Sequence, residues 1–194
     1  MNAVTALRAA DLIDAPFDGM ERYILKGKLR ESPVGARDRA TGKLLPAMPI
    51  SHSIAMTATI AALGDWLDSR PQPRCAVLSG GVGWQHGDST FGVDAMVVAA
   101  EVLAAQTGES TIVEGVPTLC VEILSPSEVI ERIDEKTDAY RAAGVPLVWL
   151  LDLHDKSVTV YRPGAEPEFF NRLMELTAEP HLPGFRVKVA DLFG

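Results

Sequence analysis

The sequence has little cysteine and no long apolar run. Its 194 residues include two cysteines, Cys75 and Cys120, and neither has a Cys or His partner at metal-ligand spacing. A disulfide scaffold and a structural zinc site are therefore not expected. No stretch reaches the roughly 18 uninterrupted apolar residues that a membrane span needs. We expect a cytoplasmic protein that does not enter a membrane.

Basic residues are fewer than acidic residues in this sequence. Lysine and arginine number 18 against 26 for aspartate and glutamate, which gives a formal net charge of -8. This balance argues against nucleic-acid binding by bulk attraction. The bases are unevenly placed, because residues 22–43 hold seven bases and two acids, whereas residues 94–144 hold ten acids and three bases. We expect a polyanion to meet the first segment, through Lys26, Lys28, Arg30, Arg37 and Arg39.

Nothing in the composition suggests more than one folding unit. Hydrophobic residues make up 47% of the chain and charged residues 23%, without a low-complexity tract, an internal repeat or a linker. A chain of this length can bury roughly 70% of its unfolded surface, which is enough for a core without covalent cross-links. We expect one globular domain over residues 1–194, with residues 1–20 as an N-terminal extension.

The first half of the chain predicts a strand pair, a long connection and a helix. Residues 22–29 are typical of two short strands around Lys26-Gly27, and residues 32–49 form a polar connection. Apolar residues then recur at helical spacing over residues 51–69, namely Met56, Ile60, Leu63 and Leu67. Three shorter elements are expected after the helix: a strand at 74–78, a glycine-rich bend at 80–87 and a buried strand at 93–100.

The second half predicts a parallel strand-helix-strand unit. Residues 118–124 and 147–151 are apolar enough for buried strands, and residues 126–143 between them have helical periodicity. A capping box at residues 125–128 marks the expected start of this helix. A crossover of this size joins parallel strands of one sheet. Residues 157–162 alternate as expected for an edge strand.

Lys136 breaks the pattern of this second helix. At 100° per residue it falls near the middle of the apolar side, which is formed by Val129, Ile133, Tyr140 and Ala143. A lysine there must either extend past the edge of the apolar side or contact an anion, because burying an unpaired charge is costly. The helix alone leaves both alternatives open.

Two acids also lie in apolar strands. Glu122 stands inside the strand at 118–124, and Asp94 opens the apolar run 95–100. A single buried acid is often only a structural hydrogen-bonding group. Two acids and a lysine together are what a metal site for phosphodiester hydrolysis requires, since they offer oxygen ligands for a divalent cation and an amine that orients or deprotonates water. Because the helix must run back over the sheet, we expect Lys136 to reach at least one carboxylate.

Four runs of the sequence together resemble a known family. They are GVPTLCVEILSPSE at 115–128, Glu135-Lys136 followed by Tyr140, AGVPLVWLLD at 143–152 and Leu182-Pro-Gly-Phe185. In this order they are similar to the Uma-type family of putative restriction endonucleases, within the PD-(D/E)XK nuclease superfamily, over residues 22–193. The resemblance implies an α/β, restriction-endonuclease-like fold with a mixed central sheet flanked by helices on both faces.

The resemblance also implies a site. Asp94 matches the Asp of the family's Pro-Asp motif, Glu122 the acid of the following strand, and Lys136 a lysine on the helix. His52 matches a usual histidine that would help to position the metal or the phosphate, and a satisfied core histidine is the alternative. Asp94, Glu122 and the backbone carbonyl of Ile123 would hold Mg²⁺ or Mn²⁺. Four positions depart from the family pattern without removing an expected ligand: Val93, Thr118, Leu147 and Val148.

The expected function is a magnesium-dependent endonuclease that acts on nucleic acid, with DNA as the expected substrate. Its expected catalytic residues are Asp94, Glu122, Lys136 and His52. A homodimer would allow both strands of a duplex to be cut. The alternative is a catalytically degenerate module of the same fold that binds nucleic acid or a partner and keeps the acids and the lysine as a buried ion cluster. Hydrolysis of another substrate by the same site also stays open.

Overall fold

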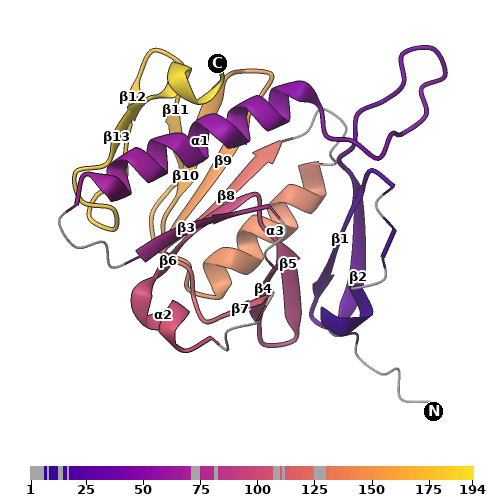
Figure 1. Cartoon of the computed structure of the whole chain (residues 1–194), viewed down its shortest axis with the longest axis horizontal. Coiled ribbons are helices and arrows are strands. Elements are labelled where there is room, and N and C mark those ends of the chain that lie inside the picture. The colour runs from indigo at the N-terminus through magenta and orange to yellow at the C-terminus, as the bar shows by residue number, and fades with distance from the viewer. Residues whose placement is uncertain are drawn as a thin grey trace.

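Two β-sheets and two long helices organise the described part of the chain. The computed structural model describes residues 7, 9–12, 15–16, 18–70, 75–80, 83–106, 110, 112–124 and 130–194. A larger, mixed sheet carries helix α1 (Ile50–Asp68) on one face and helix α3 (Ile130–Ala142) on the other, and a smaller sheet lies beside α3 (Figure 1). This is the predicted α/β arrangement. None of the helices among these residues has the length and apolarity that crossing a bilayer requires.

The larger sheet contains the predicted strand-helix-strand unit. Its strands in spatial order are β11 (Glu168–Phe170), β10 (Ser157–Tyr161), β9 (Leu147–Asp152), β8 (Leu119–Leu124), β6 (Ala95–Ala99) and β3 (Cys75–Ser79). β8 and β9 are parallel, whereas the other neighbours pair antiparallel. Helix α3 connects β8 to β9, which confirms the predicted crossover. The helix start expected at residues 125–128 lies outside the described residues.

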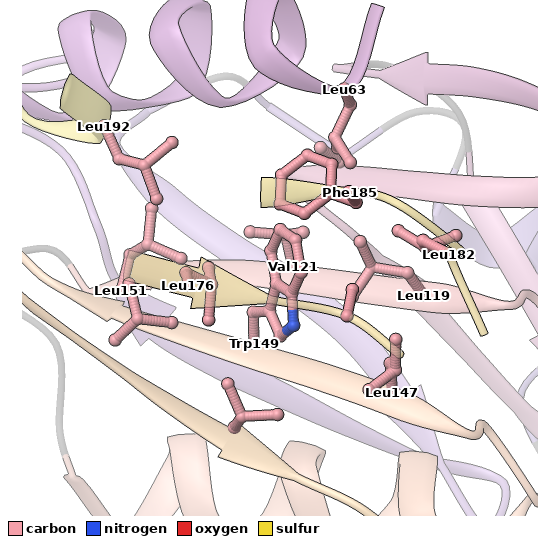
Figure 2. Packing of buried hydrophobic residues seen from close by; sticks show 14 of the residues in the cluster. Leu63, Leu119, Val121, Leu147, Trp149, Leu151, Leu176, Leu182, Phe185 and Leu192 are labelled. Atoms are coloured by element: carbon pink, nitrogen blue, oxygen red, sulfur yellow. The ribbon is translucent and has the colours of Figure 1, made fainter. Parts of the chain in front are cut away.

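Side chains alternate across the larger sheet and form two separate cores. Odd-numbered residues of β8 and β9, such as Val121 and Trp149, pack against α1 and the C-terminal segment (Figure 2). That segment consists of the hairpin β12 (Glu175–Thr177) and β13 (Arg186–Lys188) and the short helix η2 (Val189–Leu192). Even-numbered residues, such as Cys120 and Val148, pack on the side of α3. Glu122 therefore falls on the face that α3 covers.

The smaller sheet packs against the outer side of α3. Its strands in spatial order are β2 (Lys28–Pro33), β1 (Met20–Leu25), β5 (Ser89–Gly92), β4 (Gly83–His86) and β7 (Ile112–Glu114). β1 and β2 form the expected pair through Lys26-Gly27, whose φ angles of 51° and 69° are those of a type I′ turn. Phe91 and Trp84 contact the ring of Tyr140 on α3, with centroids 5.0 Å and 5.3 Å away.

Two elements differ from the sequence-based expectation in the sheets. The bend expected at residues 80–87 is wrong in part, because β4 occupies Gly83–His86. The glycines of this segment are typical of a bend, but pairing with β5 and β7 and the burial of Trp84 stabilise a strand there. β10 is not the expected edge strand, because the short strand β11 pairs with it. β11 has three residues and is largely exposed, so it lacks a periodic signal. A short helix, α2 (Ala100–Ala104), follows β6.

The helix expected at residues 51–69 is confirmed as α1, but its buried side is shifted. The buried residues are His52, Ala55, Thr59, Leu63 and Trp66. Met56, Ile60 and Leu67, which the apolar spacing placed on the buried side, are partly buried. Small and polar side chains share the contact with two large apolar ones, so apolar spacing alone misplaces the centre of this contact. The shift is what brings His52 inward.

Residues 34–49 form the expected connection, and two glycines seat it against the start of β1. A Cβ atom on either Gly19 or Gly35 would lie 2.3 Å from the carbonyl oxygen of Leu45. Gly19 also has a φ of +84°, a left-handed conformation that favours glycine. Glycine at both positions therefore allows the connection to cross the chain just before β1.

Candidate active site

The expected site residues meet where β6 and β8 separate. The ladder between these strands ends at the pair Ala95–Val121, so Asp94 and Glu122 lie just beyond it. The Oδ2 atom of Asp94 accepts a hydrogen bond from the backbone N–H of Ile123 at 2.8 Å. The side chain of Asp94 thereby bridges the gap that opens between the two strands.

His52 reaches the same point from α1. Its Nε2 atom lies 3.3 Å from the Asp94 carboxylate, and the residue is 2% exposed. Its Nδ1 atom has no hydrogen-bond partner among the described residues. The neutral ring with its proton on Nε2 can therefore donate to Asp94 without leaving a buried N–H unpaired. His52 is placed to hold the Asp94 carboxylate.

Lys136 is enclosed by oxygen atoms. Its Nζ atom lies 2.6 Å from Oε2 of Glu122, 2.7 Å from Oε1 of Glu21 and 3.3 Å from the backbone oxygen of Gly92. The residue is 1% exposed, so its side chain does not extend past the edge of the helix into solvent. The expected contact with a carboxylate is confirmed. All three N–H groups of the ammonium can find an acceptor here.

Burial governs the ionisation of this pair. It raises the pKa of Glu122 to about 8, although Lys136 opposes the change. Burial alone would lower the pKa of Lys136, but the charges and hydrogen bonds of Glu122 and Glu21 raise it well above its usual value. The two acids therefore favour the charged form of Lys136, whereas burial favours the neutral form of Glu122.

Tyr140 holds the second oxygen of Glu122. Its hydroxyl donates a hydrogen bond to Oε1 at 2.6 Å. Burial and the nearby Glu122 carboxylate raise the pKa of this hydroxyl well above its usual value, so Tyr140 remains a donor. The ring cannot move freely, because Trp84 and Phe91 pack against it. Both oxygens of Glu122 therefore have a donor in a fixed position.

Sequence reasoning missed Glu21 as a member of this site. Glu21 lies on the same face of β1 as Tyr23 and Leu25, because the three are two positions apart along the strand. Tyr23 and Leu25 belong to the core next to α3. An acid on the same face as two core residues is the signal that could have identified it. No local pattern, however, shows that β1 packs beside α3, since Glu21 and Lys136 are 115 positions apart.

A cavity of about 600 Å³ opens beside these groups. Its polar lining includes the side chains of Glu21, His52, Asp94 and Glu122, and Ile123 also lines it. Carboxylate and carbonyl oxygens are the ligands that Mg²⁺ and Mn²⁺ prefer, so the donor chemistry fits such a cation. Within the described ranges, however, no group of three or more His, Cys, Asp and Glu side chains is arranged to hold a metal ion. A cation held by the two carboxylates of Asp94 and Glu122 would therefore need a further ligand from the backbone.

The five basic residues expected to contact nucleic acid do not line this cavity. Arg30 is held by Glu135, with nitrogen–oxygen distances of 2.8 Å and 2.9 Å. The other four have exposed side chains: Lys26, Lys28, Arg37 and Arg39. Their role in nucleic-acid binding stays a prediction.

Known proteins share this architecture. A family model described as Uma2, putative restriction endonuclease, matches residues 29–190. The crystal structure of a putative nuclease belonging to DUF820 from Anabaena variabilis has a similar fold, with a TM-score of 0.72, 20% sequence identity and 89% of each chain covered. No curated protein matches the sequence. The chain belongs to the Uma2 family of putative restriction endonucleases.

Proposed function

We propose that this protein is a metal-dependent endonuclease that hydrolyses phosphodiester bonds in nucleic acid, with DNA as the expected substrate. The observation that carries the proposal is Lys136, a buried ammonium shared by Glu122 and Glu21 beside a cavity that Asp94 also lines. Carboxylates and a lysine next to open space are the groups that metal-assisted phosphodiester hydrolysis needs. The description of the matching family supports the same class of reaction.

Asp94, Glu122 and the carbonyl of Ile123 would hold Mg²⁺ or Mn²⁺. Ile123 donates its N–H to Asp94, and the N–H and C=O of one strand residue point to the same side of the strand. The carbonyl is therefore directed toward Asp94 and away from β9. A bound cation would polarise the scissile phosphate and lower the pKa of the attacking water. His52 would keep Asp94 in place.

Lys136 would orient the attacking water. Glu21 and Gly92 hold its Nζ atom independently of Glu122, so the ammonium keeps two acceptors when the Glu122 carboxylate turns toward a cation. The N–H released from Glu122 would then bond the water or a phosphate oxygen and stabilise developing negative charge. In this account Glu21 is a positioning residue that keeps Lys136 charged and in place.

One observation favours the second candidate, a degenerate module that binds nucleic acid or a partner. Both oxygens of Glu122 and all three N–H groups of Lys136 already have partners within the protein. A buried ion cluster of this kind is also stable without any ligand. Metal binding separates the two candidates, because only the nuclease needs Glu122 to exchange these partners for a cation.

Cleavage of circular DNA tests the proposal. We expect supercoiled plasmid or single-stranded circles to be cut with Mg²⁺ or Mn²⁺, left intact in EDTA, and cut again when the metal is restored. Circles have no ends, so their cleavage identifies an endonuclease. A protein that leaves both substrates intact with either metal would support the binding module.

The affinity for Mn²⁺ should rise with pH. A carboxylate must lose its proton before it can hold a cation, and burial raises the pKa of Glu122 to about 8. Between pH 6 and pH 8 we therefore expect the affinity to rise by up to about tenfold per pH unit, with release of about one proton per ion. Calorimetric titrations in two buffers of different ionisation enthalpy measure both quantities. A pH-independent affinity without proton release would place the cation elsewhere.

The exposed bases would meet phosphates outside the cavity. Arg30 would contribute less because Glu135 holds it. The other four are exposed: Lys26, Lys28, Arg37 and Arg39. Arg37 also donates a hydrogen bond to the carbonyl of Gly42. Replacing Arg37 and Arg39 together by alanine should lower the slope of log Kd against log salt by about 2. Fluorescence anisotropy of labelled DNA measures the slope. Arg172 and Arg186 replaced together by alanine remove the same charge elsewhere, and an equal effect of both pairs would contradict the assignment.

A further inference from the structure

The cavity beside the carboxylates has mainly apolar walls. Phe91 and Met20 come from the smaller sheet, Met56 comes from α1, and Val34 and Met48 come from the connection between β2 and α1. Leu12 adds to them from the short helix η1 (Ala9–Leu12). A volume of about 600 Å³ lies within the range of sites that take small organic ligands. The carboxylates of the site therefore adjoin a space that suits an uncharged, apolar group.

In the part of the chain that the structure describes, the same walls offer no free positive charge to a phosphate backbone. Among the described residues that line the cavity, Arg22 is the one lysine or arginine. Its guanidinium is bound to Asp18 at 2.8 Å and 2.9 Å and to Glu31 at 2.8 Å. Within the described ranges, the carboxylates that line the cavity with it are those of Glu21, Asp94 and Glu122. Phosphates would thus be held by a cation at the carboxylates and by the bases outside, and not by the cavity walls.

A base-paired duplex does not match these walls. Its outer surface is phosphate and sugar, and its base faces are stacked inside. An unpaired nucleotide, in contrast, exposes an apolar base face close to its own phosphate, and proteins bind such bases in pockets or on apolar and aromatic side chains. This is the combination that the cavity offers, with apolar walls next to a site for the phosphate.

We propose that the cavity takes the base of one unpaired nucleotide while its neighbouring phosphate lies at Asp94 and Glu122. The substrate class is then single-stranded or locally unpaired nucleic acid. This inference rests on the proposed nuclease function and adds the form of the substrate to it. Met48 and Met56 form the part of the wall that contacts the base, because both are partly exposed and line the cavity.

Binding of nuclease-resistant oligonucleotides tests the inference. The probes are three labelled phosphorothioate DNAs of one sequence: a single strand, the full duplex, and a single strand with abasic sites. Anisotropy is measured in Mg²⁺ on the full chain. We expect the single strand to bind at least tenfold tighter than the duplex and the abasic strand, since a stacked base contributes about that much. Equal or tighter binding of the duplex would overturn the inference.

A cavity-filling variant locates the base. Met48→Trp should weaken binding of the single strand at least tenfold and leave the duplex unchanged, because the indole occupies the proposed base position. Met174→Trp is the matched control, since Met174 is 41% exposed and does not line the cavity. Thermal unfolding checks that both variants fold. Equal binding by the two variants would overturn the assignment of the cavity.

The two proposals fail in different ways. If duplex DNA is preferred and its cleavage needs Mg²⁺ and Asp94, the proposed nuclease function is supported and the proposed binding of an unpaired base is wrong. If the single strand binds through Met48 but no DNA is cut, the proposed base-binding cavity is supported and the proposed nuclease function is wrong.

Discussion

Replacing Lys136 by methionine is expected to lower the free energy of unfolding by about 3–5 kcal/mol at a pH where Glu122 is ionised. The substitution keeps most of the side-chain length but removes the charge that Glu122 and Glu21 share. Glu122 is 3% exposed, so water cannot replace the lost partner. Without Lys136 its pKa should rise above about 8, and the loss should therefore be larger at pH 9 than at pH 7. Urea unfolding at both pH values measures the effect.

A second variant separates lost charge from lost packing. Lys136→Met combined with Glu122→Gln leaves neither charge of the closest pair, and Tyr140 can still donate to the new amide oxygen. Glu21 is better solvated than Glu122, with a side chain 19% exposed against 5%, and it should adapt to the change. We expect the double variant to recover more than half of the lost stability. A double variant as unstable as the single one would mean that packing is the cause.

Asp94→Asn and Glu122→Gln are each expected to reduce DNA cleavage at least ~100-fold and the affinity for Mn²⁺ at least ~10-fold. Loss of a group that only supports a metal ligand already costs about 10–100-fold, so loss of a ligand should cost no less. Both substitutions keep the side-chain volume and remove a charged oxygen, so the fold should remain. Plasmid cleavage at high Mg²⁺ and calorimetric titration with Mn²⁺ measure the two effects.

Exposed acids provide matched controls for these variants. Asp155→Asn and Glu101→Gln make the same chemical changes on the surface, and neither residue lines the cavity. Both should leave cleavage and metal affinity unchanged. Unchanged Mn²⁺ binding in the Asp94 and Glu122 variants would remove the metal site from the proposal. Lost cleavage with intact metal binding would instead make the two acids positioning residues.

The pairing of Lys136 with Glu122 could be predicted because both positions depend on local geometry. Helical periodicity fixes which side of α3 carries Lys136, and the alternation of β8 fixes which face carries Glu122. The connection between parallel strands then brings these two faces together, and the observed distance of 2.6 Å agrees with it. Each step uses residues that are neighbours in sequence or belong to one supersecondary unit.

Glu21 could not be predicted in the same way, because its place depends on contacts between distant segments. The smaller sheet meets α3 through Tyr23, Trp84 and Phe91, and Trp84 lies on a glycine-rich strand without a clear pattern. The shifted face of α1 has a similar cause, since the small residues Ala55 and Thr59 share the contact with two large apolar residues, while three others lie beside it. Such contacts depend on how the shapes of the packed elements fit together, and the hydrophobic periodicity of one segment does not indicate this fit.

Gly19 and Gly35 let the connection between β2 and α1, which carries Met48 of the cavity wall, lie close to the start of β1. A Cβ on Gly35 would lie 2.7 Å from the Cα of Gly19, and on either residue it would lie 2.3 Å from the oxygen of Leu45. The connection that carries Met48 therefore occupies space that a Cβ atom at Gly19 or Gly35 would fill. A side chain at either position would collide with the backbone at Leu45, so the connection that carries Met48 would have to shift. The position of one wall of the cavity thus depends on two glycines that do not themselves line it.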